Sequence, residues 1–74
     1  MANDDPRRRR AEQIRELVLG QLGNGWGATQ LQIWSAIRAR LPGSELRARE
    51  VAHALDVLRR AGSVRYTGRY WEAV

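Results

Sequence analysis

The hydrophobic positions of the chain follow a helical period in three successive segments. In the first segment they recur at spacings of three, one and four and form one face of a helix: Ala11, Ile14, Leu17, Val18 and Leu22. Asp5 can cap this helix, and Pro6 suits its first turn because no amide hydrogen is needed there. Gly23 opens a glycine-rich connection. We therefore expect the first helix over residues 6–22.

Two further helices are predicted by the same kind of pattern. Thr29 and Gln32 have the spacing of a capping box, and a Pro-Gly pair ends the helical pattern, which predicts a helix over 29–41. Its apolar face consists of Leu31, Trp34, Ile37 and Leu41. Ser44 offers the next cap, so we expect the third helix over 45–61. Its apolar face consists of Ala48, Val51, Leu55 and Leu58.

After Gly62 the period of the pattern changes from 3.6 to two, which is typical of strands. Two β-prone runs flank Thr67-Gly68, and this predicts a hairpin over about residues 63–73 with a two-residue turn. In that register Val64 faces Trp71, and both side chains close the core.

The larger aromatic residues and a few unplaced apolar residues complete this picture. We expect three aromatic side chains in the core: Trp34, Tyr66 and Trp71. Leu19, Ile33 and Val57 fall outside the three apolar faces, and Trp26 lies in the glycine-rich connection. These four residues are candidates for an interface with a second copy or another protein.

Composition excludes several classes of protein. The chain has 74 residues, no cysteine and a single histidine, His53, so we expect no disulfide, no metal site, no cofactor and no enzyme activity. The longest apolar run is three residues, which is too short for a membrane span. The first ten residues are polar and lack the pattern of a secretory signal, so a cytoplasmic, nucleoid-associated location is expected. Nothing indicates a pocket for a small-molecule ligand.

The charge points to nucleic acid. All thirteen basic residues are arginine, the net charge is +5 and the isoelectric point is about 11.3. A basic domain of this kind is a candidate for nucleic-acid binding, and the guanidinium fork matches phosphates and guanine edges. Residues 59–69 hold four arginines and no acid, whereas segment 44–58 has a net charge of −1.

The order of three helices and a hairpin resembles the winged helix-turn-helix domains of bacterial and phage regulators. The passage from their recognition helix into the wing has the pattern L-x-x-L-x-x-x-G-x-V, which is matched here by Leu55, Leu58, Gly62 and Val64. The resemblance implies a mainly α fold with a small β-hairpin. It also implies a winged helix domain over 6–74 and a short extra strand at Trp26-Gly27-Ala28. The run of four arginines at positions 7–10 separately suggests that residues 1–10 form a basic N-terminal arm and the start of the first helix.

In such domains the third helix usually enters the major groove, and the wing touches the DNA backbone. The resemblance therefore implies base contacts from the outer face of the third helix, at Arg47, Arg49, Glu50 and His53. It implies backbone contacts from arginines of the wing side, and the positive charge of the N-terminal arm suggests further backbone contacts there. The arginines are Arg60, Arg65 and Arg69 on the wing side, and Arg7, Arg8, Arg9 and Arg10 on the arm.

These observations favour a small double-stranded DNA-binding protein, such as a transcriptional regulator or a phage or plasmid accessory factor. One such module covers only about 600–1,000 Å² on DNA, so a homodimer or a protein partner is expected. The main alternative is a protein-binding winged helix that acts as an adaptor or small subunit, which the nearly neutral third helix favours. RNA binding is a third reading, because phosphate contacts carry no base information.

Overall fold

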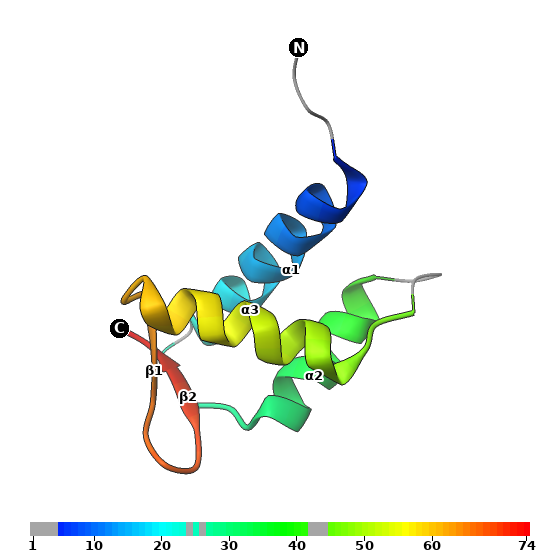
Figure 1. Cartoon of the computed structure of the whole chain (residues 1–74). Helices are drawn as coiled ribbons and strands as arrows, with labels where there is room; N and C mark the ends of the chain where they lie inside the picture. Colours follow the sequence, from blue (N-terminus) through cyan, green and yellow to red (C-terminus); the bar gives the residue numbers. More distant parts are fainter. Residues whose placement is uncertain (1–4, 24, 26, 42–44) are drawn as a thin grey trace.

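The computed structural model describes residues 5–23, 25, 27–41 and 45–74. Its elements are α1 (Pro6–Leu22), α2 (Gln30–Arg40), α3 (Ala48–Arg60), β1 (Val64–Tyr66) and β2 (Trp71–Ala73) (Figure 1). The two strands form one antiparallel hairpin. The fold class is therefore the one expected from the sequence, three helices followed by a small β-hairpin. No helix in the described part of the chain combines the length and the apolar character that a membrane crossing requires.

The first two helices begin as the sequence predicts. The Asp5 carboxylate accepts a hydrogen bond from the amide of Arg7 at 3.0 Å, and Pro6 occupies the first helical position. At α2 the Thr29 hydroxyl accepts from the amide of Gln32 at 3.2 Å, and the Gln32 side chain accepts from the amide of Thr29 at 2.9 Å. Both starts depend on residues within four positions of each other, which is why the sequence alone located them.

The predicted start of the third helix at residue 45 is wrong. The helix begins at Ala48, and Glu50 Oε1 accepts a hydrogen bond from the amide of Arg47, 3.0 Å away. The preceding residues are not helical because Leu46 is drawn into the core and its carbonyl accepts a hydrogen bond from Trp34 Nε1 at 3.0 Å. The expected cap, Ser44, lies outside the described residues.

The end of α3 leads directly into the hairpin. Gly62 has a φ of 80°, the left-handed conformation that glycine adopts without a steric penalty. The amide of Gly62 donates to the carbonyl of Arg59, and the amide of Ser63 donates to the carbonyl of Leu58. This is the Schellman arrangement, which satisfies the last carbonyls of a helix and reverses the chain.

The core lies between the three helices and the start of β1. Its buried residues are Ile14, Val18, Leu22, Ala28, Ile33, Ile37, Leu41, Leu46, Val51, Ala54, Leu55, Leu58 and Val64. Trp34, Trp71 and Leu19 are partly buried against it. The hydrophobic faces of α1 and α3 were largely predicted, although Ala48 is exposed rather than buried.

The predicted apolar face of α2 is wrong in part. Ile33, which was expected to lie off the core, is completely buried, whereas Leu31 is 70% exposed. Two residues correspond to about 200° around a helix, so Ile33 and Leu31 cannot share a face. The helix buries Ile33, Ile37 and Leu41, and Trp34 lies at the edge of this face. Leu19 and Val57, the other unplaced residues, are half-buried, and Trp26 is not among the described residues.

The predicted register of the hairpin is also wrong. Tyr66 pairs with Trp71 and Val64 with Ala73, so the loop has four residues instead of two. Thr67 closes this loop, because its amide and its hydroxyl both donate to the carbonyl of Tyr70. The shift of two positions leaves each side chain on its predicted face of the sheet.

The shifted register moves the aromatic pair to the rim of the core. The rings of Tyr66 and Trp71 are in contact in a tilted arrangement, with their centroids 4.8 Å apart. Tyr66 is nevertheless 50% exposed, so the prediction that it lies in the core is wrong. Trp71 is half-buried, and its backbone forms an antiparallel bridge with Ala28. This bridge is the short extra strand contact expected near Ala28, and it joins the hairpin to the connection between α1 and α2.

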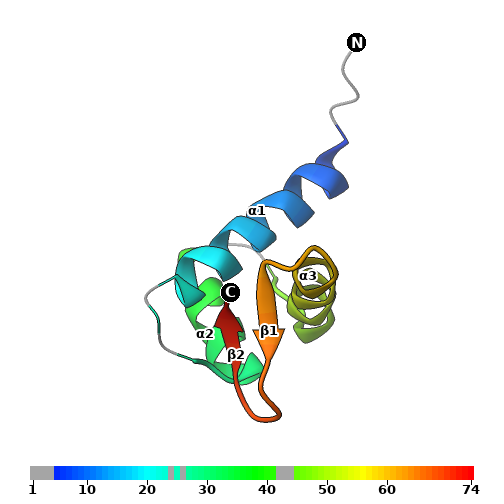
Figure 2. The ribbon, with the colours of Figure 1, turned by 90° about the vertical axis from the view of Figure 1, so that its left-hand side faces the viewer.

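Two views show how the elements are arranged. In Figure 1 α3 crosses in front of α2, and the hairpin hangs from the carboxyl end of α3. Figure 2 shows that the beginning of α1 leans to the side of the molecule on which α3 lies. The outer face of α3 and the beginning of α1 are therefore presented on one side of the protein.

Candidate nucleic-acid interface

The outer face of α3 carries polar side chains that the fold does not use. The core-facing positions of α3 are Val51, Ala54, Leu55 and Leu58. Arg49 and His53, four residues apart, are exposed on the opposite side. Neither side chain forms a hydrogen bond or an ion pair within the described residues. These two predicted base-contacting residues are thus free to meet a ligand.

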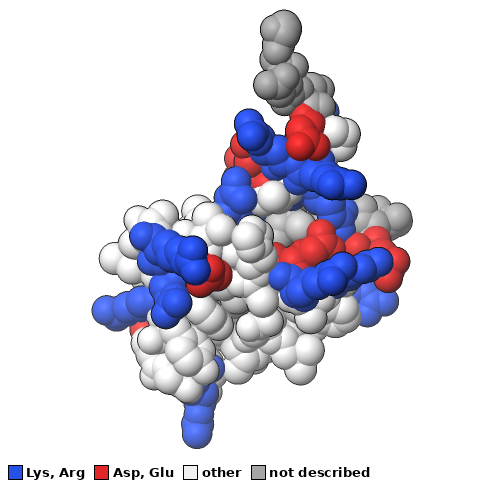
Figure 3. Space-filling model, in the orientation of Figure 1, with Lys and Arg blue, Asp and Glu red and all other residues white. Residues whose placement is uncertain are grey.

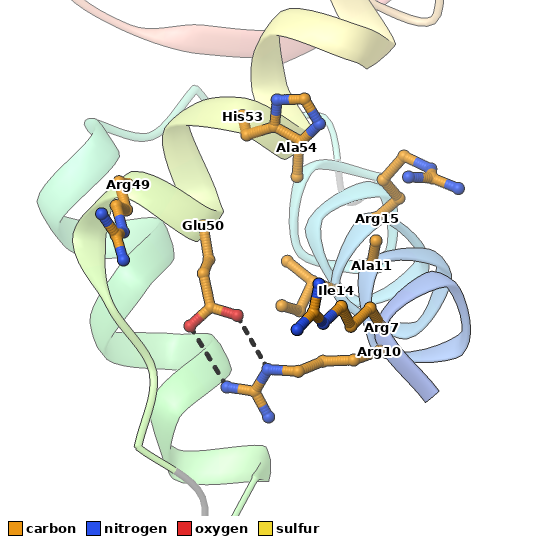
Figure 4. Close-up of a pocket in the computed structure, with 9 residues that line it drawn as sticks. All are labelled: Arg7, Arg10, Ala11, Ile14, Arg15, Arg49, Glu50, His53 and Ala54. Atoms are coloured by element: carbon orange, nitrogen blue, oxygen red, sulfur yellow. Dashed lines mark hydrogen bonds and ion pairs between the residues drawn. The ribbon is translucent and has the colours of Figure 1, made fainter. Parts of the chain in front are cut away.

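Arg10 and Glu50, in contrast, bind each other. Arg10 Nε donates to Glu50 Oε2 at 2.7 Å, and its terminal nitrogen donates to Glu50 Oε1 at 3.2 Å (Figure 4). Arg10 also donates to the carbonyl of Glu45 at 2.8 Å. The hydrogen bond from Arg10, followed by that from the amide of Arg47, lowers the pKa of the Glu50 carboxyl from its ordinary value. The same pair raises the pKa of Arg10.

This pair joins the beginning of α1 to the beginning of α3. Glu50 was predicted to contact bases and Arg10 to contact phosphate, but in the structure each satisfies the other. Both side chains are partly buried, which strengthens the pair relative to a fully exposed one. The geometry therefore gives Glu50 and Arg10 a positioning role, because they hold the start of α3 against α1.

The other arginines of the N-terminal segment belong to α1. Arg7, Arg8 and Arg9 are exposed on its first turn, so residues 7–10 form the start of the first helix, as the sequence predicts. Arg47 is exposed at the start of α3, close to Arg7 and Arg49 along one polar hollow. The structure thus brings the arginines of α1 and those of α3 together, although about forty residues separate them in the sequence.

At the end of α3 and on the hairpin, acidic partners reduce the positive charge. Arg59 and Arg60 both lie against Asp56, at 3.5 and 3.2 Å. Arg65 lies 3.3 Å from Glu72 across the hairpin. Arg69, at the hairpin loop, is exposed and forms no such pair within the described residues. The four-residue spacing of Asp56 and Arg60 on one helix is enough to predict their ion pair from the sequence. The Arg65–Glu72 pair depends on the strand register.

On one face of the molecule, the arginines surround an area in which no described residue is charged (Figure 3). Figure 3 shows positive groups over the beginning of α1, over both ends of α3 and at the tip of the hairpin. The acidic residues visible on this face lie beside arginines, in agreement with the ion pairs described above. The arrangement presents cations along the border of α3 rather than one continuous basic patch.

A groove between α1 and α3 was not predicted from the sequence. It has a volume of about 380 Å³, and the side chains that line it come from the first half of α1 and the first half of α3 (Figure 4). Ala11, Ile14 and Ala54 form its floor, and Arg7, Arg15, Arg49 and His53 stand around it. No local pattern could have revealed this groove, because it depends on how the two helices pack.

Other kinds of site find no support in the described part of the chain. No cluster of three or more His, Asp or Glu residues there could hold a metal ion, and no buried polar side-chain atom there lacks a hydrogen-bond partner. Comparisons of the chain with protein-family models, with curated proteins and with solved structures found no match.

Proposed function

We propose that this protein is a winged helix-turn-helix protein that binds double-stranded DNA. The observation that carries the proposal is the outer face of α3, where Arg49 and His53 are exposed without partners. Exposed arginines border this face on the beginning of α1 and on the hairpin. The proposal includes the role of a transcriptional regulator, or of a phage or plasmid accessory factor, in the cytoplasm at the nucleoid.

The proposed mode of binding places α3 in the major groove. An α-helix with its side chains is about 10–12 Å across, and the major groove is about 12 Å wide. Arg49 would then reach a guanine with both arms of its fork, and His53 would reach the neighbouring base edge. Arg7 and Arg8 would contact phosphates on one side of the groove, and Arg69 would contact them from the wing.

The pair formed by Arg10 and Glu50 supports this mode indirectly. It orients α3 with respect to α1, so the free cations of both helices keep a constant spacing. A fixed spacing lowers the entropic cost of binding a regular array of phosphates. In the proposal, Glu50 therefore acts on DNA affinity through Arg10 and the start of α3, without touching a base.

Protein binding is the second candidate function. Leu31 is 70% exposed and lies beside half-buried Trp34 and exposed Ala48, along a shallow apolar groove at the junction of α2 and α3. Such a patch suits a homodimer contact or a partner protein. If the protein does not bind DNA at low salt, this adaptor function is favoured instead.

The salt dependence of DNA binding tests the proposal directly. Exposed ion pairs contribute only about 0–1 kcal/mol, so Arg60 and Arg65 can exchange their acidic partners for phosphates. With about five phosphate contacts, the slope of log K against log salt concentration should be about −4 to −5. Fluorescence anisotropy with a labelled duplex at several salt concentrations measures this slope. A slope shallower than about −2 contradicts the proposal, and tighter binding of an RNA duplex than of the DNA duplex assigns the site to RNA.

Two arginines should differ in how they contribute to binding. Arg49→Ala should weaken binding to a selected site by about 1–3 kcal/mol and should reduce discrimination at one base pair. Arg69→Ala should weaken all sequences equally and reduce the salt slope by about one. Lysine at position 69 should restore binding, whereas lysine at position 49 should not, because it lacks the bidentate fork.

The comparison requires a selected duplex, a scrambled duplex and one control variant. Arg40→Ala removes an exposed arginine at the end of α2, outside the proposed interface, and should leave both affinities unchanged. If Arg49→Ala weakens both duplexes equally, α3 does not read bases, and the protein binds DNA without sequence preference.

A further inference from the structure

The groove between α1 and α3 combines an apolar floor with a cationic border. Ala11, Ile14 and Ala54 provide the floor, and the two alanines leave the space that larger side chains would fill. Ile14 and Ala54 belong to the buried core, so the floor is rigidly supported. Its volume of about 380 Å³ lies at the lower end of the range for ligand pockets, about 300–1,000 Å³.

The charges around the groove are not balanced by the fold. Arg10 is neutralised by Glu50 at one end of the groove. Arg7 and Arg15 of α1 and Arg49 of α3 form no ion pair within the described residues. These three residues line the groove and leave an excess of positive charge at its border (Figure 4). A ligand of this groove should therefore be negatively charged.

DNA alone does not account for the groove. A sugar-phosphate backbone offers charge and hydrogen-bond acceptors, but no large apolar group projects from it to fill a floor of alanine and isoleucine side chains. An acidic protein segment offers both components, since its carboxylates can pair with arginines while a large apolar side chain enters the groove. The volume suits one or two such side chains, not an extended interface.

We propose that this groove binds an acidic segment of a partner protein, anchored by a large apolar side chain and flanked by carboxylates. The anchor would lie against Ala11, Ile14 and Ala54, and the carboxylates would meet Arg7, Arg15 and Arg49. This interaction goes beyond DNA binding and does not depend on it. Since Arg49 and His53 border both surfaces, the segment would compete with DNA for the start of α3.

Two synthetic peptides of equal charge test this proposal. Each is about twelve residues long, labelled with fluorescein and rich in Glu and Asp, and the first carries Leu, Phe and Leu at helical spacing. In the second peptide the three apolar residues are replaced by Ser. Fluorescence anisotropy should show that the first peptide binds about tenfold more tightly or better. If both peptides bind equally, the surface binds anionic peptides through charge alone and the proposal is overturned.

Variants of the groove separate this interaction from DNA binding. Ala11→Leu fills the groove without a change in charge and with only a small change in helix propensity, so it should weaken binding of the apolar peptide about tenfold and leave DNA affinity unchanged. Arg15→Ala should weaken binding of both peptides. The matched control is Arg69→Ala at the hairpin, beyond the opposite end of α3, which should leave peptide binding unchanged. Thermal melting by circular dichroism confirms that each variant is folded.

Other occupants would produce different results. If the Ala11→Leu variant binds the apolar peptide as tightly as the natural protein does, the proposal is overturned, because the floor would then have no part in recognition. A dimer in native mass spectrometry that Ala11→Leu dissociates would assign the groove to a second copy of the chain. Displacement of the peptide by benzoate at equal concentration would assign it to a small organic anion. Each of these results contradicts an acidic segment of a partner protein as the occupant.

Discussion

Replacing Ile33 with alanine should lower the free energy of unfolding by about 2–5 kcal/mol. Ile33 is completely buried, so the change removes several core methyl groups and leaves a cavity between the helices. Domains of this size have a total stability of about 4–11 kcal/mol. The loss is therefore a large fraction of the total. Urea or thermal unfolding followed by circular dichroism at the α-helix signal measures it.

Leu31 provides the matched control for this prediction. It lies in the same helix, two residues before Ile33, but it is 70% exposed. Leu31→Ala should change the stability by no more than about 0.5 kcal/mol, as is usual for surface positions. A larger loss of stability from Leu31→Ala than from Ile33→Ala would show that α2 buries the face of Leu31 and Trp34. That result would contradict the orientation of α2 described above.

Replacing Glu50 with glutamine should destabilise the protein at neutral pH by roughly 1–2 kcal/mol. The change removes the ionic partner of Arg10 and replaces a charged cap acceptor with a neutral amide oxygen, and the combined loss is of this order. Because the folded-state pKa of Glu50 lies below its ordinary value of 4.5, the carboxylate contributes its stability fully above that pH. The contribution is lost as the pH falls through the lower folded-state pKa.

The pH dependence of unfolding distinguishes this effect from a general loss of packing. The difference in melting temperature between the natural protein and Glu50→Gln should be constant from pH 6 to 8 and should shrink below about pH 4.5. Glu12→Gln, a change of an exposed carboxylate on α1, is the control and should show little difference at any pH. A difference between the natural protein and Glu50→Gln that persists unchanged to low pH would contradict the role given to the Arg10–Glu50 pair.

The elements that the sequence predicted best are those with local determinants. The bounds of α1 were predicted from a cap, a proline and a glycine that lie at its own ends. The start of α2 was predicted from a capping box within four residues. The turn after α3 was predicted from Gly62, where the left-handed backbone favours glycine. In each case, the groups that determine the structure are neighbours in the chain.

The predictions that were wrong concern choices between local alternatives. Two apolar faces were available on α2, and only packing against α1 and α3 selected the one with Ile33. Ser44 suggested an early start for α3, but burial of Leu46 favoured an extended segment before Ala48. A two-residue loop was possible for the hairpin. The observed register has a four-residue loop, and in this register Trp71 also forms a bridge with Ala28. Long-range contacts outweighed local propensity at all three places.

The candidate site, too, was predicted in its local features and not in its long-range contacts. The sequence identified the arginines and His53 by residue type and by their place on a predicted helix face. It did not show that Arg10 and Glu50 neutralise each other, since forty positions separate them. Nor did it show which cations remain without a partner, because that depends on the distances between side chains of different elements.

By itself, the sequence determined three helices, a hairpin and a strongly basic character, because helix periodicity, caps and charge are properties of neighbouring residues and of composition. The tertiary structure decided which face of α2 is buried, which arginines are paired, and that α1 and α3 enclose a groove with an apolar floor. These features arise from the packing of distant segments. The energy of each contact depends on distances of a few ångströms that no local pattern encodes.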